Sequence, residues 1–383
     1  MNDIGASMRP FLALLIMVLG FGMVTAQGET SLQDEATGTT YILEEYVPAN
    51  FPVGMVFAPD GRLFYNEKTT GNVRVVSADG VLQVEPVITL PTNALQERGM
   101  LGIEISPTFE EDHLLYVMHT AEGTASDYPA NRLVRFTVDE NNQAGEVEEL
   151  LRFPVTNGLL LHNGGNIHFG ASGHLFVTLG DYGDSFNAQD LETPQGAIHR
   201  YTVTENGLIP ARGNPFGDDN SIYGYGLRNP FDFTFDPLTG NIVATENGPS
   251  CDDEVNLILP GFNYGWRENY DCPGMNPVEG MPHPYRAPLL SFTPTIAPAG
   301  ITFYEGEMFP EWQDDLFFCD WNFGRLHRVV LDESRTSVQE TYPSDLGTQQ
   351  CRLDLVVVPD GALYFGTVGT GNGTIVRLSS QSD

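Results

Sequence analysis

A histidine at the end of an apolar run is the first residue of this sequence that suggests chemistry. His162 follows Leu159–Leu161 and precedes Asn163 and a pair of glycines. Glycines at such a place let a ligand or another backbone approach closely, and an imidazole that titrates near neutrality suits a general base. Asp181 comes nineteen residues later, where the next strand of the same sheet would bring it beside His162 to set the tautomer. A histidine that only completes the packing is the alternative interpretation.

An isolated arginine is the second such residue. Arg228 stands between the apolar segment Tyr223–Leu227 and the pair Asn229-Pro230, in a chain with 18 basic and 51 acidic residues. Its planar guanidinium suits a carboxylate or a developing oxyanion. The alternative is an ordinary ion pair with one of the many acids.

A run of acidic residues is the third feature. Carboxylates and amides are concentrated in Glu246–Glu254, which also contains a Gly-Pro pair, and polar residues continue through Asn263–Trp266 to Asp271. Carboxylate and carbonyl oxygens are the ligands that Ca²⁺ takes. The spacing is not that of an EF-hand, and a solvated acidic surface is the alternative.

The elements that must position these residues are predicted by an internal repeat. An apolar strand, a turn of the Pro-Asp-Gly type and a second apolar strand recur six times. Proline presets φ at the first corner of such a turn, and glycine accepts the positive φ that closes it. The copies are 55–65, 103–117, 167–179, 233–244, 301–318 and 355–365.

Six copies over residues 41–383 predict one all-β domain, a six-bladed β-propeller. The spacing of about 57 residues per copy accommodates a four-stranded blade of about 40–50 residues and its loops. No amphipathic helix of about 12 residues or more is evident, and glycines and prolines interrupt the chain throughout. We expect Tyr41–Tyr46 to close the ring by pairing with the last blade, which hides the edge strands. A pair of β-sandwiches would not explain the six copies.

The N-terminus has the pattern of an export signal. Arg9 precedes the apolar run Phe11–Val24, and Val24-Thr25-Ala26 offers small residues for cleavage near Ala26. Because the run is short for a membrane span, residues 1–26 are predicted to be a cleaved signal peptide, with an uncleaved anchor as the alternative. Residues 27–40 then form a flexible, acidic leader. The mature protein is expected to be secreted or periplasmic, with no membrane insertion after cleavage.

Composition narrows the classes of partner. The net charge is −33 and 41% of the residues are hydrophobic, so the chain can bury a core but has no electrostatic attraction for nucleic acid or an anionic membrane. Four cysteines in an exported chain predict disulfides. Three pairings are possible, and the sequence-local pairs Cys251–Cys272 and Cys319–Cys351 are favoured. Neither pair has the spacing of a zinc site.

These stretches together resemble the glucose/sorbosone dehydrogenase family, which includes soluble quinoprotein glucose dehydrogenase and the bacterial aldose sugar dehydrogenases. The resemblance runs from about Val53 to Leu378 and implies a six-bladed propeller. The motifs that carry it are Glu97–Gly102, His162–Gly165, Gly180-Asp181, Ala188–Asp190, Leu227–Pro230, Glu246–Asn256, Asn263–Trp266, Ala297–Gly300 and Phe309–Trp312.

The resemblance also implies an activity. It implies pyrroloquinoline quinone (PQQ) with Ca²⁺ as the cofactor, bound at the channel mouth. The substrate is then an aldose, which is oxidised at its anomeric hydroxyl to a lactone by hydride transfer to the quinone. The identity of the electron acceptor is not implied. His162 matches the family's general base and Asp181 the acid near it. Arg228 and Asn229 match residues at the quinone, and Glu97 falls where a glutamine contacts the cofactor in the glucose enzyme.

The implied calcium ligands come from the acidic run and the segment after it. The backbone carbonyls of Gly248 and Pro249 match those that hold the cofactor's calcium. Glu254, Tyr264 and Asp271 match a second, structural calcium site.

The implied cofactor anchor departs from the family. The glucose enzyme holds the PQQ carboxylates with a lysine and two arginines, but here no lysine follows Lys68, and the stretch that matches the lysine is Asp320–Arg325. The positions that match the two arginines hold Cys351 and Leu353, with Arg352 between them. In a strand, one step turns a side chain to the opposite face, so the anchor is predicted to be poor in cations, with Arg352 as the remaining candidate.

Three functions therefore compete. The first is a PQQ- and calcium-dependent aldose dehydrogenase. The second is a non-catalytic, calcium-binding propeller that binds a sugar or a protein, since the family contains interaction domains such as that of hedgehog-interacting protein. The third is a calcium-dependent hydrolase in which metal-bound water attacks the substrate. Arg325 or Arg352 pointing into the channel would favour the dehydrogenase.

Overall fold

The computed structural model describes residues 30–33, 40–124, 128–155, 161–272, 282–342, 350–358, 360–368 and 373–380. The predicted signal peptide and most of the predicted leader lie outside these residues. The described chain is almost entirely β-strand, with one α-helical turn and two short 3₁₀ turns: α1 (Phe109–Asp112), η1 (Asn187–Gln189) and η2 (Pro310–Trp312). Within this part of the chain no helix has the length and apolar character needed to cross a bilayer.

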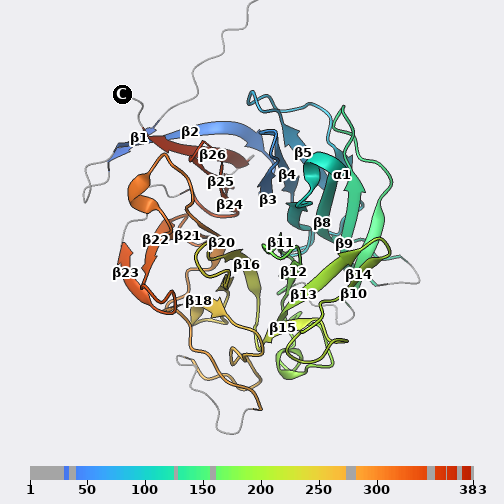
Figure 1. The fold of residues 1–383 in the computed structure, drawn as a ribbon, viewed down its shortest axis with the longest axis vertical. Coiled ribbons are helices and arrows are strands. Elements are labelled where there is room, and N and C mark those ends of the chain that lie inside the picture. The colour runs from blue at the N-terminus through green and yellow to red at the C-terminus, as the bar shows by residue number, and fades with distance from the viewer. Residues whose placement is uncertain are drawn as a thin grey trace, which may run out of the picture.

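Six antiparallel sheets are arranged in a ring, which confirms the predicted six-bladed β-propeller (Figure 1). Each of the first five blades follows the chain order. Blade 1 contains β3 (Pro52–Phe57), β4 (Leu63–Glu67), β5 (Asn72–Val76) and β6 (Ile88–Thr89), and blade 2 contains β7 (Met100–Ile105), β8 (Leu114–Ala121), β9 (Ala130–Thr137) and β10 (Glu148–Pro154). Blade 3 contains β11 (Ile167–Phe169), β12 (Leu175–Leu179), β13 (Ala197–Thr204) and β14 (Gly207–Pro210), with β15 (Ile222–Tyr225) also against β13. Blade 4 contains β16 (Pro230–Phe235), β17 (Ile242–Glu246), β18 (Asp253–Ile258) and β19 (Leu290–Phe292), and blade 5 contains β20 (Pro298–Phe303), β21 (Leu316–Asp320), β22 (Leu326–Leu331) and β23 (Val338–Tyr342).

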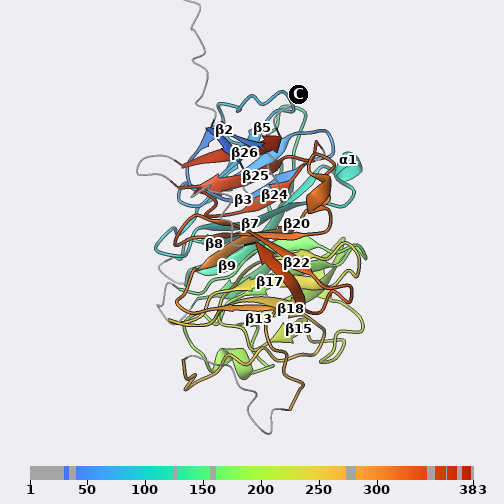
Figure 2. The same cartoon turned by 90° about the vertical axis from the view of Figure 1, so that its left-hand side faces the viewer.

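Blade 6 is built from both ends of the chain. It contains β24 (Leu355–Val357), β25 (Leu363–Thr367) and β26 (Gly373–Ser380), followed by β2 (Thr40–Ala49) and then β1 (Thr30–Gln33). β2 pairs with β26 in a register that runs from Tyr41 opposite Ser380 to Ala49 opposite Gly373. The two strands lie together in both views (Figures 1 and 2). The predicted closure through Tyr41–Tyr46 is confirmed, and it ties the start of the propeller to its end.

The six sequence repeats are the hairpins that join the first two strands of each blade. Gly61 and Gly240 in these turns have φ of 86° and 72°, as the turn pattern predicts. In blades 2 and 5 the connection is longer and contains α1 or η2. The first strands of neighbouring blades contact one another around the ring, so residues just before these strands are brought to one end of the channel.

The hydrophobic core is divided into clusters that lie between neighbouring blades. Between blades 5 and 6, for example, Trp312 packs with Phe309 and Phe317. Because both faces of a blade meet a neighbour, the second strands β4, β12, β17 and β21 are buried at every residue. A charged residue on such a strand, such as Glu246 on β17, therefore stands in the interior and requires polar partners.

Two disulfides link Cys251 to Cys272 and Cys319 to Cys351, which confirms the favoured pairing. The first bridges the loop after β17 to the segment beyond Trp266. The second joins the end of β21 in blade 5 to the segment that precedes β24 in blade 6, close to the channel.

Candidate active site

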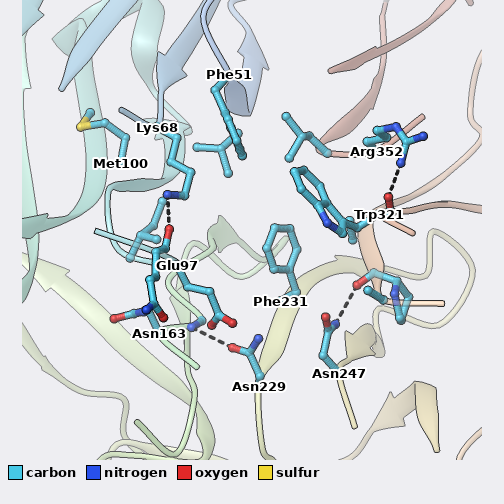
Figure 3. Close-up of a pocket in the computed structure, with 18 residues that line it drawn as sticks. Phe51, Lys68, Glu97, Met100, Asn163, Asn229, Phe231, Asn247, Trp321 and Arg352 are labelled. Carbon is cyan, nitrogen blue, oxygen red and sulfur yellow. Dashed lines mark hydrogen bonds between the residues drawn. The ribbon is translucent and has the colours of Figure 1, made fainter. Parts of the chain in front are cut away.

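A cavity of about 320 Å³ opens where the first strands of the six blades begin. This volume is at the lower end of the range of roughly 300–1,000 Å³ for small-molecule sites. Every blade contributes to its wall (Figure 3). The polar and aromatic lining residues are Phe51, Lys68, Gln96, Glu97, Asn163, Asn229, Phe231, Asn247, Trp321 and Arg352.

His162 lies beside this cavity on the segment that leads into β11. Its backbone has φ of 55°, in the left-handed region that non-glycine residues seldom adopt. Two contacts hold it there. The His162 N–H donates to Glu97 Oε2 at 2.5 Å, and a Cβ on Gly180 would lie 2.1 Å from the His162 carbonyl oxygen, so only glycine permits this approach. Glu97, predicted to contact the cofactor, lines the cavity and also positions His162.

The predicted contact between His162 and Asp181 is present and is buried. Nδ1 of His162 lies 2.6 Å from Asp181 Oδ1, and Asp181 is 1% exposed. Asp181 also accepts hydrogen bonds from Trp266 Nε1 at 2.7 Å and from Gly183 N at 2.6 Å. Since this carboxylate acts as an acceptor toward all three groups, Nδ1 of His162 carries the proton. Nε2 is then left with a lone pair, as a general base requires.

Arg228 lies near the same pair. Its guanidinium donates through one nitrogen to the carbonyl oxygens of Asn247 and Gly248, at 2.8 and 2.9 Å, and it lies 5.5 Å from the centre of the Trp266 ring. Trp266 thus contacts both Arg228 and Asp181. Burial lowers the pKa of Arg228, and the surrounding carboxylates, first among them Asp181, oppose this shift.

Glu246, at the end of β17, organises this segment. Its Oε1 accepts the backbone N–H groups of Arg228 and Asn229 at 2.5 and 3.1 Å. Burial raises the pKa of Glu246 to about 8. Asn229 in turn accepts the Gly164 N–H through Oδ1 at 3.2 Å, which joins the segment before blade 4 to the one before blade 3. Asn229, predicted to contact the cofactor, lines the cavity.

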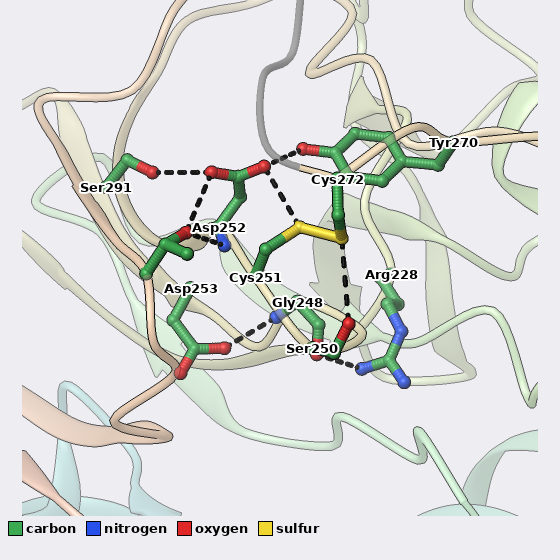
Figure 4. The surroundings of a disulfide bond; sticks show 10 residues. Arg228, Gly248, Ser250, Cys251, Asp252, Asp253, Tyr270, Cys272 and Ser291 are labelled. Carbon is green, nitrogen blue, oxygen red and sulfur yellow. Dashed lines mark hydrogen bonds between the residues drawn. A yellow bond between two sulfur atoms is a disulfide. The ribbon is translucent and has the colours of Figure 1, made fainter.

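The predicted calcium loop is held by Asp253, a residue that sequence reasoning did not separate from its acidic neighbours (Figure 4). Asp253 Oδ1 accepts the Gly248 N–H at 2.8 Å, and Oδ2 accepts the N–H groups of Ile296 and Ala297, each at 2.6 Å. Burial raises its pKa. Asp253 therefore joins the loop that carries Gly248 and Pro249 to the Ala297 segment of the cavity wall.

The residues predicted for a second calcium occupy different surroundings. Glu254 is 1% exposed and accepts a hydrogen bond from Asn256 at 3.0 Å, and burial raises its pKa well above the ordinary value. Tyr264 packs in the core, where its hydroxyl donates to the Leu257 carbonyl at 2.9 Å. Asp271 is exposed. In the part of the chain that the structure describes, no three His, Cys, Asp or Glu residues form a group placed to hold a metal.

Arg352 is the remaining candidate of the predicted cation-poor anchor. Arg352 lines the cavity, and its guanidinium donates to the Trp321 carbonyl. The segment around it precedes β24 and is not a strand, so the alternation of strand faces does not turn its side chain away. Arg325, in contrast, is absent from the cavity wall and lies 4.5 Å from the Phe323 ring centre.

Lys68 is the cation that sequence reasoning missed. It follows β4 in blade 1 and lines the cavity. The available signal was that Lys68 is the only lysine of the chain. The resemblance to the family, however, placed the cofactor's lysine in a later blade. Phe51, beside Lys68, stacks on Trp321 with 5.7 Å between ring centres, so aromatic rings from two distant segments also meet here.

The fold and the site together define a six-bladed propeller with an acid-supported histidine and a nearby arginine beside one end of its channel. The chain belongs to the Glucose / Sorbosone dehydrogenase family, which it matches over residues 49–377.

Individual relatives agree with this assignment. A protein of Synechocystis sp. is 31% identical over 86% of this chain and 84% of its own length. The aldose sugar dehydrogenase YliI of Escherichia coli is 26% identical, covering 91% of this chain and 94% of its own. The PQQ-bound aldose sugar dehydrogenase of Streptomyces coelicolor is a structural neighbour with a TM-score of 0.71 and 26% identity, covering 89% of this chain and 98% of that one.

Proposed function

We propose that this protein is a PQQ- and calcium-dependent sugar dehydrogenase that oxidises the anomeric hydroxyl of an aldose to a lactone. The observation that carries the proposal is the convergence of His162, Asp181 and Arg228 at one end of the channel, where Trp266 contacts both Asp181 and Arg228. Membership of the family supports it, as do relatives named for aldose oxidation and a PQQ-bound neighbour.

The cavity fits a planar, anionic cofactor. Aromatic side chains of Phe51, Phe231 and Trp321 offer flat apolar surface, and Lys68 and Arg352 offer positive charge. When bound, PQQ would accept the hydride and calcium would polarise its quinone carbonyl. Asn229 and Glu97 are the polar residues of the wall that we assign to cofactor contact.

The calcium of the cofactor would be held by backbone carbonyls of Gly248 and Pro249. A carbonyl oxygen has two lone pairs, and Arg228 uses one of those on Gly248. The described residues of this loop offer backbone carbonyl oxygens and no cluster of carboxylates around a metal position. Such a set fits a calcium ion whose remaining ligands come from the cofactor and from water. A second calcium, at Glu254, Tyr264 and Asp271, remains a proposal from the resemblance.

The residues of the chain perform the proton transfer. Nε2 of His162 takes the proton of the anomeric hydroxyl as negative charge develops on the sugar oxygen. Asp181 stabilises the resulting imidazolium through Nδ1 and keeps the ring in place, while Trp266 and Gly183 hold Asp181. The guanidinium of Arg228 provides fixed positive charge beside the reacting groups without reorganisation.

The proposal includes export of the mature protein after removal of residues 1–26. Its substrate is then a small sugar outside the cytoplasm, and its electron acceptor is a separate molecule whose identity stays open. A chain of this negative charge has no attraction for nucleic acid.

The test is reconstitution. Purified protein freed of cofactor is mixed with micromolar PQQ and with Ca²⁺, and the quinone absorbance and the reduction of a dye are followed with a panel of aldoses. We expect a sugar-dependent bleaching of the quinone and steady dye reduction. No spectral change at millimolar sugar would reject the dehydrogenase, and sugar binding without turnover would favour the non-catalytic binding module.

A further inference from the structure

Lys68 occupies an unusual electrostatic position. Its Nζ donates to two backbone carbonyls, those of Gln96 at 2.5 Å and Arg98 at 2.8 Å, and it lies 5.4 Å from the Phe51 ring centre. No carboxylate within ion-pair distance is found for it among the described residues. An ammonium has three donors, so one N–H remains available at the cavity wall, where Glu97 interacts with the charge of Lys68 from beyond ion-pair distance.

Arg352 has the same property on the other side of the cavity. Within the described chain its guanidinium bonds to the Trp321 carbonyl and forms no ion pair. Figure 3 shows Lys68 and Arg352 on opposite sides of the cavity, with the rings of Phe51 and Trp321 between them. The Lys68 ammonium is directed toward the Gln96 carbonyl and the Arg352 guanidinium toward the Trp321 carbonyl.

The chain as a whole has 51 acidic residues and a net charge of −33. Some of its arginines pair with carboxylates, as Arg328 does with Asp315 and Arg335 with Asp236, whereas Lys68 and Arg352 stand at the cavity wall without such a pair among the described residues. Two cations without a carboxylate partner, separated by aromatic rings, complement a flat ligand that carries anionic groups at separate edges.

We propose that Lys68, in blade 1, binds a carboxylate of the cofactor and replaces the lysine that the family supplies from a later blade, while Arg352 binds a second carboxylate. This proposal rests on the proposed function, because PQQ is the flat polycarboxylate that the function requires. Lys68 is thus an affinity-determining residue and takes no part in the proton transfer at His162.

The test measures cofactor binding rather than turnover. Lys68→Gln and Lys68→Arg are compared with the unmodified protein, freed of cofactor and supplied with Ca²⁺, by titration with PQQ and with the trimethyl ester of PQQ, which lacks the carboxylate charges. We expect Lys68→Gln to weaken PQQ binding by about 10-fold or more and to leave the affinity for the ester within about 2-fold. Lys68→Arg should retain most of the affinity for PQQ. Arg62→Gln, at the turn of blade 1, is the matched control for loss of a cation.

The outcomes separate this proposal from the proposed function. Binding of PQQ by the unmodified protein with unchanged affinity in Lys68→Gln would overturn the role of Lys68 and leave the dehydrogenase standing. Equal losses for PQQ and its ester would show that Lys68 only shapes the cavity, and would also overturn it. No binding of PQQ by the unmodified protein would overturn both. If Lys68→Gln does not fold, as judged by circular dichroism, the salt dependence of PQQ affinity in Lys68→Arg and in the unmodified protein decides, because a bound carboxylate predicts weaker binding at high salt in both.

Discussion

Two histidines six residues apart show how one blade uses the same side chain in two ways. His162 precedes β11 and contacts Asp181 through Nδ1 alone, at 2.6 Å. His168 lies within β11 and contacts Glu104 through Nδ1 at 2.9 Å and Asp232 through Nε2 at 3.2 Å. With both nitrogens donating to carboxylates, His168 is a cation held in place. Nε2 of His162 has no such partner among the described residues, so it is open to a ligand.

The two histidines also differ in how completely the polar groups around them are hydrogen-bonded. Around His168, the carboxylates also tie neighbouring blades together: Asp232 accepts the Ile301 N–H at 2.9 Å, and Asp354 accepts the Met55 N–H at 2.5 Å. Beside His162, donors are left over, including Nδ2 of Asn163, which is buried and has no partner among the described residues. We infer that a polar cluster with all its groups satisfied stabilises the ring, whereas one with unused groups is available for chemistry.

Removal of His162 is expected to have the largest effect on activity. His162→Ala should lower the rate of dye reduction by about 10²–10⁴-fold, the usual contribution of a general base, and should leave PQQ affinity and the melting temperature nearly unchanged. Steady-state kinetics and cofactor titration measure the two. His174→Ala, on the hairpin turn of the same blade, is the control. Equal loss of cofactor and activity would mean that His162 is structural.

Removal of His168 should give the opposite result. His168→Gln leaves Glu104 and Asp232 without their cation in the channel, and we expect the free energy of unfolding to fall by about 2–4 kcal/mol. Turnover per folded molecule should stay within a few-fold of normal. Urea denaturation followed by fluorescence measures stability. An unchanged unfolding midpoint would show that the satisfied cluster contributes nothing to the ring.

The same cluster predicts how stability depends on pH. Its two carboxylates raise the pKa of His168 to about 10 despite burial, so its stabilisation is complete below about pH 6.5 and is lost as the pH rises toward 10. Burial and Asp232 raise the pKa of Asp354 to about 7, so the folded state also loses stability as the pH rises from about 4 to 7. Both changes have the same sign, so the free energy of unfolding should fall as the pH rises from about 4 to about 10.

Two variants divide this pH dependence into its parts. Asp354→Asn should flatten the stability profile between pH 4 and 7, and His168→Gln should flatten it between about pH 6.5 and 10. Denaturation curves at a series of pH values measure both. A slope that neither variant changes would place its origin in the overall negative charge of the chain instead.

The smallest effect concerns the support of Asp181. Trp266→Phe removes the hydrogen bond from Nε1 to Asp181 but keeps an aromatic ring beneath Arg228. The loss of one such bond should lower kcat by about 2–10-fold, with little change in KM, and the pH profile of kcat should shift because Asp181 then holds the imidazolium less firmly. A change in KM alone would assign Trp266 to sugar binding.

The site was predictable where its residues are close in sequence or carry rare motifs. His162 and Asp181 belong to one blade, and the strand that joins them brings the two together. Strand alternation gives no orientation for Arg352, because its segment, before β24, is not a strand. Asp253 was not recognised, since its backbone partners at Ile296 and Ala297 lie 43 and 44 residues away.

The sequence alone determined the number of blades and the closure by the N-terminal strand, because turn residues and the apolar period act locally and repeat. It favoured the two disulfides that join cysteines near in sequence, but it left three pairings possible. Only the tertiary structure decided which charged groups remain unpaired at the channel. Lys68 reaches the cavity because carbonyls 28 and 30 residues further along the chain hold its ammonium there. Such contacts depend on how whole blades pack against one another, and no local pattern of residues encodes them.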